Sequence, residues 1–151
     1  MDPYVFEVEA GHVLTFARAV GDEQLGHDIA TPGMPVPATF PSASVQFDPA
    51  HMRGLRPSGS LAGISSTVGG SVLHAEQVFE YFAPVRVGDS LIVTEYDGDT
   101  WHKQSRRAGD LTFHEILRDY RDLAGNLVLR SRMVLVDTEF AVSDEGVNHG
   151  R

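Results

Sequence analysis

Two side chains near the start of the sequence have the types that acid–base chemistry uses. Asp22 and His27 are a carboxylate and an imidazole five positions apart, and such groups can transfer protons when they converge on one water molecule. Residue type alone also allows a structural interpretation, in which Asp22 makes local turn hydrogen bonds and His27 is a solvated loop histidine. The sequence leaves both interpretations open.

Basic residues are concentrated at one further place. Lys103, Arg106 and Arg107 fall within five positions of a chain that has 12 Lys and Arg residues against 21 Asp and Glu residues. Such a cluster could bind the phosphates of a ligand, with Arg53 and Arg56 as further contacts. It could equally be a solvated loop between two strands.

The sequence gives no support for thiol chemistry, metal binding, or binding to nucleic acid or membranes. The chain has no cysteine, which excludes a thiol nucleophile, a disulfide and a thiolate metal site. The remaining histidines lack the i, i+4 spacing of a zinc site, so no metal is predicted. The formal net charge of -9 argues against binding nucleic acid or an anionic membrane surface. We expect a cytoplasmic protein, since no signal sequence or long apolar run is present.

The length and patterning predict one domain with a helical module followed by strands. The chain has 151 residues, 42% of them hydrophobic, which suits a single core. A helix is predicted from Gly11 to Gly21, with Val13, Leu14, Ala17 and Val20 on its apolar face. Residues 22–37 are predicted to form a long loop, because their prolines remove backbone donors.

A second helix is predicted over residues 38–54. Thr39 could cap its start, and Pro41 fits the first helical turn. Asp48 and Pro49 repeat that signature, which predicts a bend before the end at Gly54. Residues 55–70 are predicted to be loop.

Period-2 alternation predicts five strands. They cover residues 4–9, 72–81, 91–96, 111–121 and 127–136. The predicted turns cover residues 84–89, 97–99 and 122–126. We expect the domain to span residues 1–138 and residues 139–151 to form a flexible tail.

The segment from Leu73 to Asp89 resembles the MaoC-like dehydratases of the N-terminal-half type. It reads His-Ala-Glu-Gln at its start and Gly-Asp at its end. Residues 16–22 and 36–41 are similar to the helix and the hot-dog-helix start of the same family. The resemblance covers roughly residues 5–138.

This resemblance implies an α+β fold with a single hot-dog domain, in which an antiparallel sheet wraps a long, broken central helix. It also implies (R)-specific hydration of trans-2-enoyl thioesters or the reverse dehydration, on acyl-CoA or acyl-carrier substrates and without a further cofactor. We expect a homodimer or a heterodimer with another hot-dog subunit. Two alternatives stay open: a non-catalytic acyl-binding subunit of a heteromeric dehydratase, and a thioesterase.

The resemblance also implies roles for named residues. The family pairs an Asp with a His five residues later, and Asp22 and His27 keep that spacing. Since prolines lack an N–H, the thioester oxygen would be bound by backbone donors of Val36, Ala38 or Thr39. The acyl tunnel is expected beside Phe40, Ala43, Ser44 and Phe47, the phosphate contact at Lys103, Arg106 and Arg107, and supporting contacts at His74 and Glu76.

Overall fold

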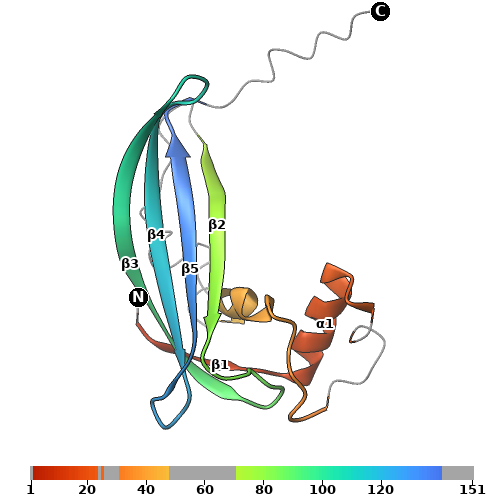
Figure 1. Ribbon diagram of the computed structural model, residues 1–151. Coiled ribbons are helices and arrows are strands. Elements are labelled where there is room, and N and C mark those ends of the chain that lie inside the picture. The colour runs from red at the N-terminus through yellow and green to blue at the C-terminus, as the bar shows by residue number, and fades with distance from the viewer. Residues whose placement is uncertain (1, 24, 26–30, 48–70, 141–151) are drawn as a thin grey trace, which may run out of the picture.

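The chain folds around one antiparallel sheet, seen in a computed structural model that describes residues 2–23, 25, 31–47 and 71–140. The strand order is β1-β3-β4-β5-β2, and every adjacent pair is antiparallel. The α+β prediction is confirmed (Figure 1). The elements are β1 (Tyr4–Glu7), α1 (Ala10–Val20), the 3-10 helix η1 (Phe40–Phe47), β2 (Val72–Tyr81), β3 (Ser90–Ser105), β4 (Gly109–Arg121) and β5 (Leu127–Thr138).

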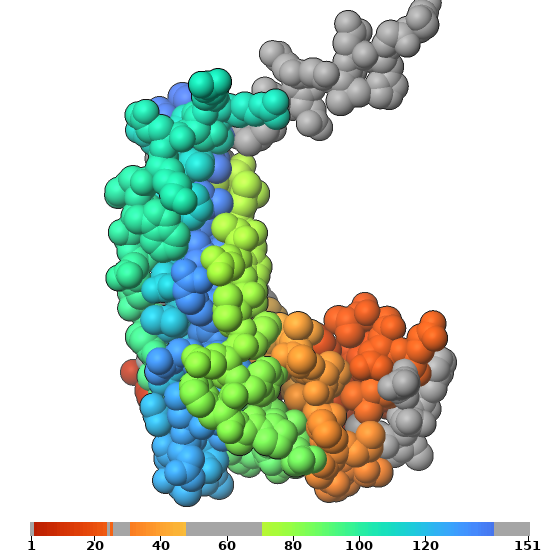
Figure 2. All heavy atoms as spheres, viewed as in Figure 1, coloured from red at the N-terminus to blue at the C-terminus, as the bar shows by residue number. Residues whose placement is uncertain are grey.

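Both helices lie on one side of the sheet, close to the end where β2 finishes (Figure 1). Figure 2 shows α1 and η1 projecting from that end, while the rest of the sheet continues beyond them. The core lies between the helices and this part of the sheet. Its fully buried side chains include Phe6, Val13, Phe40, Leu91 and Tyr120.

One row of residues crosses all five strands on the face that meets the helices. Tyr4 pairs with Val93, Val93 with Tyr120, Tyr120 with Leu129, and Leu129 with Tyr81. Residues directly opposite one another in a sheet project to the same face. Three strands therefore present a tyrosine to the segment that contains η1.

The second predicted helix is a 3-10 helix in its described part. The carbonyl of Ala38 accepts a hydrogen bond from the Tyr81 hydroxyl, and that of Pro41 from the Tyr120 hydroxyl. The carbonyl of Thr39 accepts from both the N–H and the hydroxyl of Ser42. These partners compete with the i→i+4 bonds of an α-helix. Residues 48–54, where a bend and an end were predicted, lie outside the described residues.

The prediction of a turn at residues 97–99 is wrong. Strand β3 continues to Ser105, and its pairing with β4 shifts register between Asp97 and Thr100. The carboxylate of Glu115 on β4 accepts a hydrogen bond from the Asp99 N–H at 3.0 Å, so the segment is held in the sheet as a bulge. The turn that joins β3 to β4 lies at residues 106–108 instead.

Helix α1 ends at Gly21 as predicted. Gly21 has φ 75° and its N–H donates to Arg18, while the Asp22 N–H donates to the Ala17 carbonyl. This is a Schellman-type end, for which a glycine in the left-handed region is favoured. Val13 and Ala17 are buried as expected, but Val20 is 55% exposed and does not belong to the buried face. In the described part of the chain, no helix has the length and hydropathy needed to cross a membrane.

Candidate functional site

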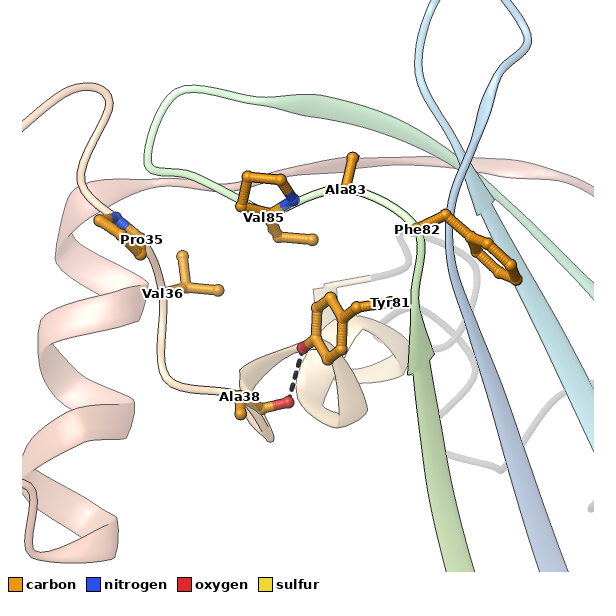
Figure 3. Close-up of a pocket in the computed structure, with 8 residues that line it drawn as sticks. Pro35, Val36, Ala38, Tyr81, Phe82, Ala83 and Val85 are labelled. Carbon is orange, nitrogen blue, oxygen red and sulfur yellow. Dashed lines mark hydrogen bonds between the residues drawn. The ribbon is translucent and has the colours of Figure 1, made fainter.

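An apolar pocket of about 460 Å³ lies where β2 ends. Two segments form it: the loop before η1, and the end of β2 together with the residues that follow it. In Figure 3, Tyr81, Val36 and Val85 surround the space, while the ring of Phe82 points away from them. The lining residues are Pro35, Val36, Ala38, Tyr81, Phe82, Ala83, Pro84 and Val85.

Backbone hydrogen bonds hold these two segments together. The Val36 N–H donates to the Val85 carbonyl at 3.1 Å, and the Val87 N–H donates to the Met34 carbonyl at 2.9 Å. The Arg86 guanidinium adds a bond to the Gly33 carbonyl at 2.8 Å. The Val36 N–H is therefore already engaged by the Val85 carbonyl, and a thioester oxygen could bind it only by displacing that bond.

Tyr81 supplies the one polar side-chain atom in the pocket lining. Its hydroxyl donates to the Ala38 carbonyl at 2.6 Å (Figure 3). Burial, together with the neighbouring Tyr120, raises the pKa of Tyr81 to about 12. The phenol is therefore neutral at physiological pH and cannot serve there as a base.

The other two predicted donors to a thioester oxygen are the N–H groups of Ala38 and Thr39, which differ in orientation. The Ala38 carbonyl points to Tyr81, and in a trans peptide the N–H of the next residue points the opposite way. The Thr39 N–H is therefore directed away from Tyr81. Within the described residues, the Ala38 N–H donates to no acceptor, and it remains the predicted contact for a thioester oxygen.

The residues predicted to line an acyl tunnel lie outside the lining of this pocket. None of Phe40, Ala43, Ser44 and Phe47 lines the pocket. Phe40 and Phe47 pack with Phe6, at ring separations of 5.6 and 6.0 Å. Ser44 is buried between two tyrosines, accepting from the Tyr4 hydroxyl at 3.0 Å and lying 2.9 Å from the Tyr120 hydroxyl. Phe40 and Ser44 therefore belong to the core.

Asp22 makes the local turn bond that residue type alone allows. One carboxylate oxygen, Oδ1, accepts from the Leu25 N–H at 3.0 Å. The residue is half-buried just after α1. His27 lies outside the described residues, so the structure gives no distance between the Asp22 and His27 side chains. Catalysis by this pair stays a prediction.

His74 and Glu76 are distant from the pocket. They precede Tyr81 by seven and five positions on the same strand, which corresponds to roughly 15–25 Å at the rise of an extended chain. The His74 ring nitrogen lies 3.0 Å from the Glu76 carbonyl, and the Glu76 carboxylate pairs with Arg132 at 3.0 Å. Arg132 also pairs with Glu115, so Glu76 belongs to a charged group across β2, β5 and β4.

The basic cluster lies at the opposite end of the sheet. Lys103 is part of β3, with its Nζ 5.5 Å from the centre of the Phe113 ring, and Phe113 stacks on Trp101. Arg106 and Arg107 occupy the turn between β3 and β4, far from the end of β2 (Figure 1). A ligand in the pocket does not adjoin this cluster in the same chain. Arg53 and Arg56 lie outside the described residues.

Sequence reasoning missed most of the pocket lining. Residues 84–89 were predicted only as a turn, and Tyr81 only as the end of a strand. The signal was the uninterrupted run Tyr81-Phe82-Ala83-Pro84-Val85, because an apolar run that continues past a strand end is unusual for a solvated turn.

A family model described as "FAS1-like, dehydratase domain region" matches residues 1–131. A solved MaoC-like dehydratase is 26% identical, with a TM-score of 0.58, and the match covers 90% of this chain and 39% of that chain. This chain therefore spans well under half of that protein. No curated protein matches the sequence.

Two further solved structures share the fold. One belongs to the HadBC complex, a 3R-hydroxyacyl-ACP dehydratase from Mycobacterium tuberculosis, with 19% identity, a TM-score of 0.58 and coverage of 89% of this chain and 91% of that chain. The other is YbaW, a probable thioesterase from Escherichia coli, with 13% identity, a TM-score of 0.54 and coverage of 91% and 82%. The predicted hot-dog fold is confirmed.

Proposed function

This chain belongs to the family of FAS1-like dehydratase domain regions, and so to the MaoC-like hot-dog proteins. On that premise, we propose that it is an (R)-specific enoyl-thioester hydratase and 3-hydroxyacyl-thioester dehydratase. The observation that carries the proposal is the apolar pocket beside Ala38 and Tyr81. Such a pocket suits an acyl chain, since ligand sites combine apolar walls with few polar groups.

The reaction adds water across a carbon–carbon double bond. The water oxygen forms a bond to the β-carbon, one proton passes from water to a base, and one proton is delivered to the α-carbon. Negative charge develops on the thioester oxygen during the attack, and a backbone N–H can stabilise it. The dehydration is the same sequence in reverse.

The proposed roles fall on two residues that follow α1 in the sequence and on one residue in the loop before η1. Asp22 and His27 would orient the water and exchange its proton, and the Ala38 N–H would bind the thioester oxygen. Neutral acid–base chemistry of this kind needs no resident cofactor, because coenzyme A or carrier-bound pantetheine arrives as part of the substrate.

A second candidate function is an acyl-holding subunit of a heteromeric dehydratase. The turn bond from Leu25 to the Asp22 carboxylate favours it, because it gives Asp22 a structural role. The similarity to a chain of the HadBC complex also agrees with it. The exposed edge strand β2 would then pair with a different hot-dog chain that carries the catalytic residues.

One assay separates the candidates. The purified chain is incubated with crotonyl-CoA and with a longer enoyl-CoA, and both the enoyl absorbance and free thiol are followed. Loss of enoyl absorbance without thiol release supports the hydratase. Thiol release identifies a thioesterase instead. Binding without either signal, followed by turnover once a partner chain is added, identifies the acyl-holding subunit.

A further inference from the structure

The hydrogen bond made by Tyr81 determines what its oxygen can offer to a ligand. A phenol has one proton and two acceptor lone pairs. The Tyr81 proton is directed to the Ala38 carbonyl, 2.6 Å from the phenol oxygen. Toward the pocket, the Tyr81 oxygen is therefore a hydrogen-bond acceptor.

The side chain that carries this acceptor is partly exposed and keeps a constant charge. Tyr81 remains 38% exposed and lines the pocket. Because its pKa is raised to about 12, the phenol keeps its proton, and its bond to Ala38, throughout the physiological range. The remaining lining side chains belong to Pro, Val, Ala and Phe, none of which can accept a hydrogen bond.

The two ligands of the proposed reaction differ in the group that this acceptor would recognise. A trans-2-enoyl chain carries no hydrogen-bond donor. A 3-hydroxyacyl chain carries one hydroxyl on an otherwise apolar chain. That chemistry matches a pocket with apolar walls and one neutral acceptor.

We infer that Tyr81 is a specificity-determining residue, whose oxygen accepts a hydrogen bond from the 3-hydroxyl of an acyl chain packed against Val36 and Val85. The inference rests on the proposed function, because it takes the pocket as the acyl site. It assigns Tyr81 a role in recognition and none in proton transfer.

Affinity for a matched ligand pair tests this inference. The two ligands are coenzyme A thioethers with the same alkyl chain, one carrying a 3-hydroxyl and one lacking it. Without a carbonyl, neither can eliminate water. Their dissociation constants are measured by calorimetry for the wild-type chain, Tyr81→Phe and Tyr96→Phe. Tyr96 is the control because it loses a phenol that bonds to Asp119 on the other face of the sheet.

The inference predicts that Tyr81→Phe lowers the preference for the hydroxylated ligand by about three- to tenfold, the range of one neutral hydrogen bond. Tyr96→Phe leaves the preference unchanged. An unchanged preference in Tyr81→Phe overturns the inference. Equal loss of affinity for both ligands also overturns it, because the lost contact would then lie on the pantetheine arm or in the Ala38 loop. Absence of binding to the wild-type chain does the same.

A hydration assay on the same preparations separates this inference from the proposed function. Hydratase turnover with an unchanged preference overturns the role of Tyr81 alone. A changed preference without turnover supports the role of Tyr81 in recognition and contradicts the hydratase.

Discussion

The Tyr120 hydroxyl donates a hydrogen bond to the Pro41 carbonyl at 2.9 Å, and both residues are fully buried. Tyr4 and Tyr81 lie in the same row across the sheet and bind Ser44 and Ala38. The register of the sheet therefore fixes the segment that forms one wall of the pocket. Small shifts of these tyrosines would move the Ala38 N–H.

Removing the Tyr120 hydroxyl should destabilise the fold. Tyr120→Phe leaves the Pro41 carbonyl without this donor in a buried site, which costs about 1–3 kcal/mol. Urea denaturation should show a lower midpoint with an unchanged slope. Tyr96→Phe, which removes a partly exposed phenol, is the matched control and should shift the midpoint less. Equal midpoints for wild-type and Tyr120→Phe would mean that this network does not hold η1.

The ion pair between Asp119 and Arg130 should make stability depend on pH. Hydrogen bonds from Arg130 lower the pKa of the Asp119 carboxyl from its ordinary value of 3.8. A lowered folded-state pKa contributes stability that is present above the unfolded value and is lost as pH falls through the folded value. We expect Asp119→Asn to be less stable than wild-type at pH 6, and the difference to shrink as pH falls below about 4.

Urea midpoints measured from pH 6 to pH 2.5 provide the comparison. A constant gap between wild-type and Asp119→Asn would contradict this account. The gap would then arise from packing or from the neutral hydrogen bonds of the side chain.

Asp22 and His27 are predicted to act on one water molecule. Asp22→Asn and His27→Ala should each lower kcat by roughly 100-fold or more, with little change in substrate affinity. Because both would act on the same water, the double variant should lose about as much as the worse single variant. Full activity in His27→Ala would contradict the assignment. Since Asp22 also caps a turn, thermal stability is measured beside kcat to separate the two effects.

The outer edge of β2 predicts self-association or a partner chain. This ten-residue strand is exposed over most of its length, including Leu73 and Val78 at 49% and 42%. In the described structure it pairs only with β5, and long exposed edge strands are usually covered. Light scattering at micromolar concentration should give a mass of about twice 16.5 kDa. A monomeric mass would count against a homodimer and leave pairing with another chain.

The features that could be predicted from sequence are those with local causes. Helix α1 ends at Gly21 because a glycine can adopt the positive φ of its terminal turn. The β4–β5 hairpin follows from alternation on both sides of residues 122–126, where the Asp122 carboxylate binds the N–H groups of Ala124 and Asn126. These signals lie within a few residues of the structure that they specify.

The features that could not be predicted depend on contacts between distant residues. The bulge at Asp97 is held by Glu115, sixteen positions beyond Asp99. The 3-10 form of η1 depends on tyrosines from other strands. The Val36 N–H is occupied by Val85, which is close only in the folded chain. No period or short motif in the sequence encodes these pairings.

Turnover by the isolated chain tests the central claim most directly. Purified protein is mixed with crotonyl-CoA, and the product is separated and assigned to the R or S form of the 3-hydroxyacyl thioester. We predict loss of the enoyl absorbance, formation of the R product and no release of free thiol. No turnover by a folded chain that still binds the ligand, or thiol release in place of hydration, would contradict the hydratase.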